Sequence, residues 1–294
     1  MRACPGCGDV GVVKFAEKID HAKLTADSFS SRKRPELLHH EYLECTGCKS
    51  LFVRSVPSQS ELGQKYEAAT FISEVESASA ARTYVGLVEK MKVLPDSNVL
   101  DLGCADGAFL LELHRHGVRN LAGVEPSIES IAAADEAVRH LIVQGGLEAL
   151  VAGTTYRLVT CFQTIEHVSD PEDFIGSVRE RVSEGGYFAI ACHNRRSIVN
   201  KLLGQRSPIF DIEHMQLFTP SGIRALFERN GFSDVRVKAY ANTYPLFYWI
   251  SLAPVPRIIK DFVDKRRQWR LFRTPITFPV GNLLVVGRKA NRSA

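Results

Sequence analysis

The sequence has 294 residues, 45% of them hydrophobic, and its 37 Lys and Arg residues exceed its 33 Asp and Glu residues by only four. A chain of this length and apolar content can bury a large core, which excludes a mostly disordered protein and predicts one large domain with an appendage, or two domains. The small net charge excludes the dense basic surface of a dedicated nucleic-acid binder.

The N-terminus, Met-Arg-Ala-Cys-Pro-Gly-Cys, lacks the apolar core of a signal peptide, and no apolar run is long enough to cross a membrane. We therefore expect a cytoplasmic protein. Four of the seven cysteines form two Cys-x-x-Cys pairs, and the other three, Cys104, Cys161 and Cys192, lie in or beside expected strands. In a reducing compartment this pattern favours a metal site over disulfides.

Residues 1–60 are expected to form a zinc ribbon. Cys4 and Cys7 share one glycine-containing turn, and Cys45 and Cys48 share another. Two such turns offer four thiolates, a tetrahedral set that suits Zn²⁺, and with every position filled by sulfur the zinc is structural. Coincidental or redox-active Cys-x-x-Cys pairs are the alternative.

The 37 residues between the two cysteine pairs are expected to hold a hairpin, with strand-like flanks at 10–19 and 41–53 and an exposed loop at 27–35. The loop contains a short basic cluster, residues 31–35. Nine basic residues nevertheless face seven acidic ones over residues 1–60, which is a poor attractor for phosphate. Substrate capping or a subunit contact is therefore the expected role of the ribbon.

A linker with a helix, residues 61–95, precedes a large domain, residues 96–294. In that domain short apolar strands alternate with amphipathic helices, which predicts an α/β fold: a doubly wound, mostly parallel sheet. Strands are expected at 99–102, 121–124, 141–143, 158–162, 187–191, 235–239 and 281–289, and helices at 107–116, 127–139 and 171–182. Ligands of such sheets bind at the carboxyl ends of the strands.

The turn that follows the first of these strands, Gly-Cys-Ala-Asp-Gly at 103–107, departs from the Gly-x-Gly-x-x-Gly fingerprint of dinucleotide binding. Asp101 precedes it, and a carboxylate there repels phosphate and attracts a cationic amino group. The next strand runs into Glu125, placed to accept hydrogen bonds from both hydroxyls of a ribose. A ligand with a ribose, a positive amino-acid end and no phosphate is S-adenosylmethionine.

These residues resemble the class I S-adenosylmethionine-dependent methyltransferases, and more closely a bacterial branch whose fourth strand runs into Ile-Glu-His-Val. The resemblance covers roughly residues 80–240 and implies a Rossmann-like sheet with an antiparallel last strand. The segments that carry it, in the family's order, are VLDLGCADG (99–107), LAGVEPS (121–127), VTCFQTIEHVSDP (159–171), GGYFAIACHN (185–194) and EHMQLFTPSGIRALFERNGF (213–232).

The resemblance implies that Asp101 and the glycine turn surround the methionine part of the cofactor, that Glu125 holds the ribose, and that Gln163 lies near the transferable methyl. Many relatives bind the adenine amino group with an acid after the third strand, where this chain has Gly146. Nearby backbone groups or Glu148 are the alternatives, and weaker cofactor binding is expected. The implied cofactor site is Asp101, Gly103, Cys104, Ala105, Gly107, Glu125, Pro126, Gly146, Leu147 and Gln163.

Transfer to a hydroxyl is helped by a general base, and three histidines are candidates. His167 follows the fourth strand, His193 ends the fifth, and His214 lies beside Asp211 and Glu213. Each is expected to face the cofactor. A structural role stays open for each: orienting the fourth-strand loop, solvation at a strand end, or anchoring a loop.

An insertion, residues 242–280, separates the last two strands. Its first half is apolar and aromatic, and residues 257–273 carry seven basic residues against two acidic ones. Three interpretations stay open: an acceptor-binding cap, a helical hairpin packed on the sheet, or a membrane-surface element. In the last, residues 245–273 contact the inner face of the membrane, with Phe247, Tyr248 and Trp249 at headgroup level and the cations on anionic lipid.

The insertion resembles that of methyltransferases of bacterial surface-polysaccharide and glycolipid synthesis, which implies a sugar acceptor, nucleotide- or lipid-linked. The leading hypothesis is therefore a zinc-ribbon methyltransferase acting on a sugar or another small hydroxylated acceptor. A zinc-ribbon RNA methyltransferase and a catalytically inactive interaction module are the alternatives. The sequence does not predict the acceptor atom or the oligomeric state.

Overall fold

The computed structural model describes residues 2–18, 28, 37–58, 61, 74–94 and 96–290. Apart from Ser28, which is buried, the expected exposed loop at 27–35, its basic cluster and most of the linker before residue 74 lie outside the described residues.

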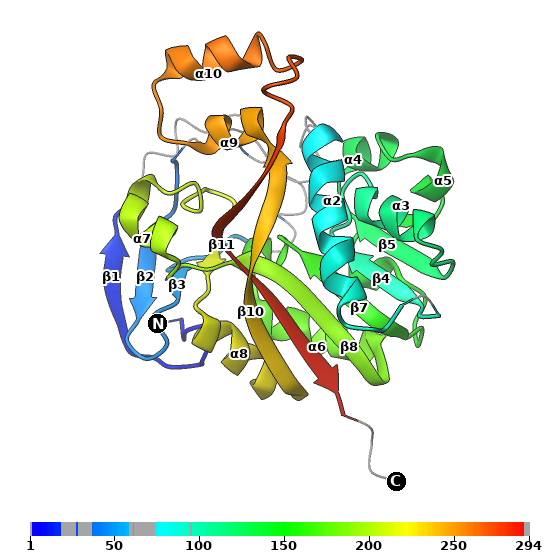
Figure 1. Ribbon diagram of the computed structural model, residues 1–294. Helices are drawn as coiled ribbons and strands as arrows, with labels where there is room; N and C mark the ends of the chain where they lie inside the picture. Colours follow the sequence, from blue (N-terminus) through cyan, green and yellow to red (C-terminus); the bar gives the residue numbers. More distant parts are fainter. Residues whose placement is uncertain are drawn as a thin grey trace.

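A seven-stranded sheet forms the body of the large domain (Figure 1). Its strands from one edge to the other are β10 (Phe232–Pro245), β11 (Pro275–Lys289), β8 (Val182–His193), β7 (Tyr156–Phe162), β4 (Val99–Leu102), β5 (Leu121–Glu125) and β6 (Ile142–Gln144). The run from β8 to β6 is parallel, whereas β11 is antiparallel to both β8 and β10. The expected Rossmann-like fold is confirmed.

Helices cover both faces of this sheet, so its central strands are mostly apolar and buried on both faces. All four residues of β4 are buried. One face carries α2 (Glu74–Glu89), α3 (Ala108–Arg115), α4 (Ile128–Ala132) and α5 (Glu136–Arg139). The other carries α6 (Pro171–Arg181) and α8 (Pro220–Arg229), with the short helix α7 (Ile198–Leu203) beside β11. Single 3₁₀ turns follow β6 (Leu147–Ala149), β7 (Ile165–His167) and α7 (Gly204–Arg206).

The single helix expected at 127–139 is wrong, because two short helices occupy that stretch. The Asp135 carboxylate accepts a hydrogen bond from the Ala137 N–H at 2.9 Å and thereby starts α5. A side chain that caps a new helix competes with continuation of the old one.

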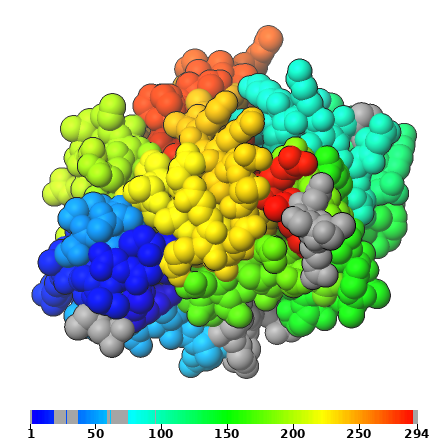
Figure 2. All heavy atoms as spheres, turned by 90° about the horizontal axis from the view of Figure 1, so that it is seen from below, coloured from blue at the N-terminus to red at the C-terminus, as the bar shows by residue number. Residues whose placement is uncertain are grey.

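The N-terminal ribbon shares a second sheet with the large domain. β1 (Val12–Ala16), β2 (Tyr42–Cys45) and β3 (Leu51–Val53) are antiparallel neighbours, as the hairpin expectation requires, and β3 then pairs with β9 (Gln216–Leu217). Figure 2 shows the blue N-terminal residues directly against the yellow α8 region, where the Arg229 side chain donates to the Gly6 carbonyl. The ribbon is thus part of the same packed unit.

The insertion between the last two strands is a projecting arm (Figure 1). Its start and end remain strand, because residues 242–245 continue to pair with residues 275–278 beyond the body of the sheet. Between them lie α9 (Leu246–Leu252) and α10 (Arg257–Asp264), and Phe247, Val263 and Phe272 form a small core beneath them. No helix among the described residues has the length and apolar character needed to span a membrane.

Candidate active site

A cavity of about 350 Å³ opens where the central strands end. Residues that follow β4, β5 and β7, together with the last residue of β8, reach its lining. The lining includes most of the site residues expected from the sequence. The cofactor residues among them are Asp101, Gly103, Cys104, Ala105, Glu125, Pro126 and Gln163, and the candidate bases are His167, His193 and His214. The cavity therefore brings together residues from segments distant in the sequence at the expected edge of the sheet.

Asp101 lies at the base of this cavity and is 4% exposed. Burial raises the pKa of its carboxyl to about 7; the Thr160 hydroxyl, which donates to Oδ1 at 2.7 Å, opposes the shift, and the nearby Glu125 carboxylate adds to it. A buried carboxyl of this kind gains most when a cation reaches it, because the charge pair then replaces the lost hydration.

The glycine turn and Glu125 hold each other in place. Glu125 accepts the Ala105 N–H through one carboxylate oxygen and the Ser127 N–H through the other, both at 2.9 Å. Each carboxylate oxygen has a second lone pair, so both can still accept a hydroxyl of a ribose. At Gly103, with φ of 70°, an added Cβ would lie 2.7 Å from the Thr164 hydroxyl, which explains the glycine.

Two non-glycine residues in the lining adopt left-handed backbone conformations: Ala105 with φ of 48° and Gln163 with φ of 58°. Such strain persists where the surrounding structure enforces it, and it concentrates at functional sites. The Asn242 amide oxygen, on another wall, is buried without a hydrogen-bond partner among the described residues. An orphaned acceptor in a polar cavity fits a ligand that donates hydrogen bonds.

Three of the expected cofactor residues lie outside the lining. Gly107 begins α3 with φ of 66°, where an added Cβ would lie 2.9 Å from Ile142. The Gly146 N–H donates to the Glu148 carboxylate at 2.8 Å, and Leu147 begins a 3₁₀ turn. Contacts of Gly146, Leu147 and Glu148 with adenine therefore remain predictions.

The three candidate bases form one cluster in the cavity wall. The His214 ring lies 5.0 Å from that of His167 and 5.2 Å from that of His193, between centroids. His214 Nδ1 is 2.7 Å from the Ile209 carbonyl, and His193 Nδ1 is 2.9 Å from the Asn282 side-chain oxygen. Because the Ile209 carbonyl can only accept, His214 Nδ1 carries the proton and its Nε2 is the basic nitrogen.

Carboxyl groups surround this histidine cluster. His167 Nδ1 lies 3.8 Å from a Glu213 carboxylate oxygen. Beneath the cluster the fully buried Glu166 accepts the His193 N–H at 2.6 Å, and burial raises its pKa to about 7. Burial also lowers the pKa of His193 to about 3, and the neighbouring His214 adds to that shift, so the His193 imidazole is neutral at pH 7.

Comparison with known proteins identifies the family. A family described as "Methyltransferase domain" matches residues 71–237. The chain belongs to this methyltransferase family. Among curated proteins, it is 25% identical over 178 residues to the ubiquinone biosynthesis O-methyltransferase of Vibrio cholerae, covering 54% of this chain and 73% of that protein. The enzyme of that name from Cupriavidus pinatubonensis is 28% identical over 187 residues, covering 58% and 73%.

Solved structures agree on the fold. The YcgJ protein of Bacillus subtilis superposes with a TM-score of 0.53 at 18% identity, covering 71% of this chain and 99% of that one. The fold is thus that of the class I methyltransferases, and the family membership favours a methyltransferase enzyme over the inactive interaction module.

The ribbon of this methyltransferase supports the loop that carries His214. The fully buried Tyr42 hydroxyl donates to the His214 carbonyl at 2.6 Å, and the Val53 N–H donates to the Met215 carbonyl at 2.9 Å. Met215 in turn donates its N–H to the Glu166 carbonyl at 2.8 Å. The ribbon is therefore linked to the backbone of His214 directly, through the Tyr42 hydroxyl, and to that of Glu166 through Met215.

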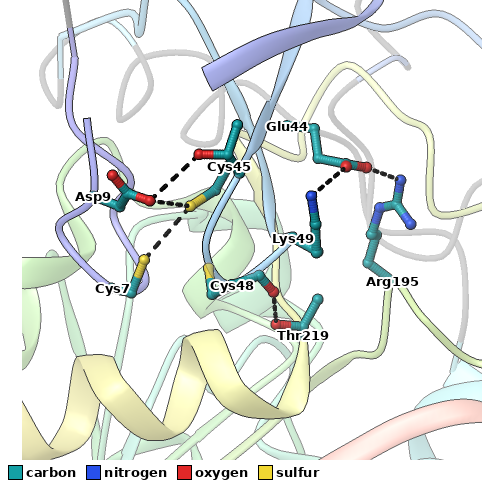
Figure 3. A network of polar contacts seen from close by, with 9 residues as sticks. Cys7, Asp9, Glu44, Cys45, Cys48, Lys49, Arg195 and Thr219 are labelled. Carbon is teal, nitrogen blue, oxygen red and sulfur yellow. Dashed lines mark hydrogen bonds and ion pairs between the residues drawn. The ribbon is translucent and has the colours of Figure 1, made fainter. Parts of the chain in front are cut away.

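Figure 3 shows the polar contacts at the outer side of this junction. Glu44 on β2 bridges Lys49 and Arg195, with the closest Arg195 nitrogen at 2.6 Å. The Thr219 hydroxyl donates to the Cys48 carbonyl at 2.7 Å, so one of the cysteine turns is itself hydrogen-bonded to the start of α8. This side of the ribbon is packed against the methyltransferase domain.

The four cysteines of the ribbon form a compact group. Their sulfur atoms all lie within 4.8 Å of one another, with Cys4 and Cys48 at 3.6 Å and Cys7 and Cys45 at 3.5 Å. A tetrahedral metal with metal–sulfur bonds of about 2.3 Å spaces its ligands by about 3.8 Å. The donor set and its dimensions are therefore compatible with a closed, four-sulfur metal site.

Several residues of the site were not predicted as site residues from the sequence. Asn242 and Asn282, on the two long strands of the arm, line the cavity, as do Tyr244, Tyr248 and Trp249. Their aromatic rings are in contact, with Tyr244 and Tyr248 centroids 4.5 Å apart. Phe247 is buried, and Tyr248 and Trp249 are half-buried in the cavity lining, so these three aromatic residues contact the protein itself. A membrane contact of the insertion stays a prediction. The feature of the sequence that could have revealed these residues is the aromatic stretch at 242–249, Asn-Thr-Tyr-Pro-Leu-Phe-Tyr-Trp.

Proposed function

We propose that this methyltransferase transfers a methyl group to a hydroxyl oxygen of a small acceptor, with a nucleotide- or lipid-linked sugar as the leading class. The observation that carries the proposal is the convergence of His167, His193 and His214 in a cavity that Asp101 and Glu125 also line. Proton removal is needed for a hydroxyl nucleophile, and a cluster of imidazoles beside carboxylates serves that need.

The names of the relatives support oxygen as the acceptor atom, since the Vibrio cholerae and Cupriavidus pinatubonensis proteins are both O-methyltransferases. The aromatic residues of the arm support a ring-shaped acceptor. Tyr244, Tyr248 and Trp249 offer apolar faces for the C–H side of a sugar, and Asn242 and Asn282 offer hydrogen-bonding groups for its hydroxyls.

Bound S-adenosylmethionine supplies an electrophilic methyl group on a sulfonium. Asp101, once ionised, attracts the cationic end of the cofactor, and Glu125 accepts the ribose hydroxyls. We assign the base to His214, because the Ile209 carbonyl fixes its Nδ1 proton and leaves Nε2 as the basic atom. His167 and His193 flank it, and Glu213, beside His167, adds negative charge that stabilises a protonated imidazole.

We further propose that Cys4, Cys7, Cys45 and Cys48 bind a structural Zn²⁺. The compact four-sulfur geometry supports this assignment. All four positions are then filled by sulfur, so the ion takes no part in methyl transfer. Its role is to hold the ribbon that supports the His214 loop.

The decisive experiment supplies methyl-labelled S-adenosylmethionine and purified protein to a bacterial extract that is then divided into RNA, protein, lipid and sugar fractions. We expect label in the sugar or glycolipid fraction with the wild type and none with Asp101→Ala. Label in RNA would support the RNA methyltransferase alternative instead. Label in no fraction, together with unaltered cofactor binding by Asp101→Ala and Glu125→Ala, would overturn the site assignment.

With an acceptor identified, three variants rank the histidines. His214→Ala is expected to lower kcat by 10²- to 10⁴-fold, the usual range for loss of a general base, with cofactor affinity retained. His167→Ala and His193→Ala are expected to have smaller effects. A larger loss with either one, while His214→Ala keeps near-normal kcat, would move the base to that residue.

A further inference from the structure

The tip of the arm leaves large apolar side chains uncovered. Ile258, Phe262, Trp269 and Leu271 are 77%, 48%, 56% and 63% exposed. Ile258 and Phe262 are four residues apart on α10, so they lie on the same side of that helix. The side of α10 that faces the protein is already packed, because Val263 contacts Phe247 and Phe272. Within the described residues these outward side chains form a ridge that the fold itself does not bury.

Cations surround this ridge. Residues 257–273 contain seven Lys and Arg residues and two Asp residues. The Arg266 guanidinium lies 4.0 Å from the centre of the Phe262 ring and 5.4 Å from that of Trp269, so charge and aromatic surface are interleaved. Arg267 and Arg270 are exposed beside Trp269. We call this combined surface, residues 257–273, the arm surface.

We propose that the arm surface binds an anionic lipid membrane. Exposed Ile, Phe, Trp and Leu side chains gain by entering the region between headgroups and acyl chains, and the surrounding Lys and Arg residues gain by approaching anionic headgroups. Both features serve one partner only if that partner is apolar inside and negative at its surface. The cations are those of the membrane interpretation drawn from the sequence, but the apolar residues differ, because Phe247, Tyr248 and Trp249 contact the protein itself.

Charge argues against a second copy of this chain as the partner. A symmetric contact places the same patch on both sides, so each arm surface would meet an equally basic one. A nucleic acid would satisfy the cations but leave the apolar ridge without a partner. In Figure 1, α10 is at the end of the arm, with α9 between it and the rest of the molecule. That position leaves a flat partner room to approach.

The test is co-sedimentation of the full-length protein with vesicles of phosphatidylcholine alone or with about one third phosphatidylglycerol. We expect binding to the anionic vesicles, at least tenfold weaker binding to the neutral ones, and weakening as salt is raised. Ile258→Glu combined with Phe262→Glu should reduce binding to anionic vesicles at least tenfold. Arg267→Glu combined with Arg270→Glu should do the same without changing the apolar ridge.

The matched control is Val10→Glu combined with Val151→Glu, since these side chains are 71% and 78% exposed away from the arm. That variant should bind as the wild type does. Equal binding by the wild type and both arm variants, or no binding by any of them, overturns the proposal. Self-association of the wild type that is lost in the Ile258→Glu, Phe262→Glu variant, without vesicle binding, would assign the surface to a second copy instead. The assay needs no cofactor or acceptor, so its result is independent of the proposed function.

Discussion

The ribbon and the arm are both additions to the same methyltransferase sheet, yet most large apolar residues of the ribbon are buried, whereas several at the tip of the arm are exposed. In the ribbon, Tyr42, Leu43 and Phe52 are at most 1% exposed, and β3 extends its sheet onto β9. In the arm, Ile258 is 77% exposed, and among the described residues the arm ends of the two strands, 242–245 and 275–278, pair only with each other. A buried addition supports the site from inside, whereas an uncovered one is available to an external partner.

The largest effect is expected from breaking the ribbon. Cys45→Ser removes one of the four sulfur ligands, and structural metal binding is itself folding free energy. We expect loss of the metal, a decrease in the free energy of unfolding of roughly 4 kcal/mol or more, and loss of activity. Metal analysis and thermal unfolding measure these changes. Normal metal content and normal melting in the variant would contradict the zinc assignment and the supporting role together.

A smaller change tests the link between the ribbon and the site. Tyr42→Phe deletes only the hydroxyl that donates to the His214 carbonyl. The buried carbonyl then loses this hydrogen bond, which costs about 1 kcal/mol of stability. Because the His214 loop loses an anchor, we expect kcat to fall about tenfold, or about 1.4 kcal/mol in activation free energy, with an unchanged KM for S-adenosylmethionine. Tyr156→Phe, a buried tyrosine outside the cavity, is the matched control.

Local sequence patterns predicted individual strands and the cysteine turns, whereas contacts between distant segments required the structure. The mostly apolar run Val-Leu-Asp-Leu predicted β4 with its observed ends, and the cysteine spacing predicted four sulfurs that do come together. The pairing of β3 with β9 was not predictable, since Phe52 and Gln216 lie in segments joined only by the tertiary fold. For the same reason the approach of His167 to His214, and the place of Asn282 beside His193, required the structure.

The pH dependence of cofactor affinity tests the role of Asp101 without involving the ribbon or the arm. The folded pKa of Asp101 is about 7, raised above its ordinary value, so at pH 6 the carboxyl is mostly protonated and at pH 8 mostly ionised. A cationic ligand favours the ionised form, so affinity should rise about tenfold from pH 6 to pH 8. Calorimetric titration with S-adenosylmethionine at the two pH values measures this change in affinity. Asp101→Asn should bind more weakly and lose most of this dependence; an equally steep profile in that variant would assign it to another group.

The raised pKa also has a consequence for the free protein. Stability due to Asp101 is fully present below the unfolded pKa of about 4 and is lost as pH rises through the folded value of about 7. Glu166 acts in the same direction over the same window. His193 acts oppositely, because its lowered pKa contributes stability above about 6.5 that is lost as pH falls toward 3. Asp101→Asn should therefore remove part of the decline in melting temperature between pH 5 and pH 7.

The smallest effect on stability is expected from substitutions in the arm, and it sharpens the contrast with the buried ribbon. Ile258→Glu combined with Phe262→Glu places charges where water already reaches, so the free energy of unfolding should change by no more than about 0.5 kcal/mol. Phe52→Glu places one charge in a fully buried ribbon position and should prevent stable folding, because an unpaired buried charge is not tolerated. Thermal unfolding of the two variants side by side measures the difference. Marked destabilisation by the arm substitutions would mean that these side chains are covered within the protein itself, and the arm surface would then have no apolar ridge to offer a membrane.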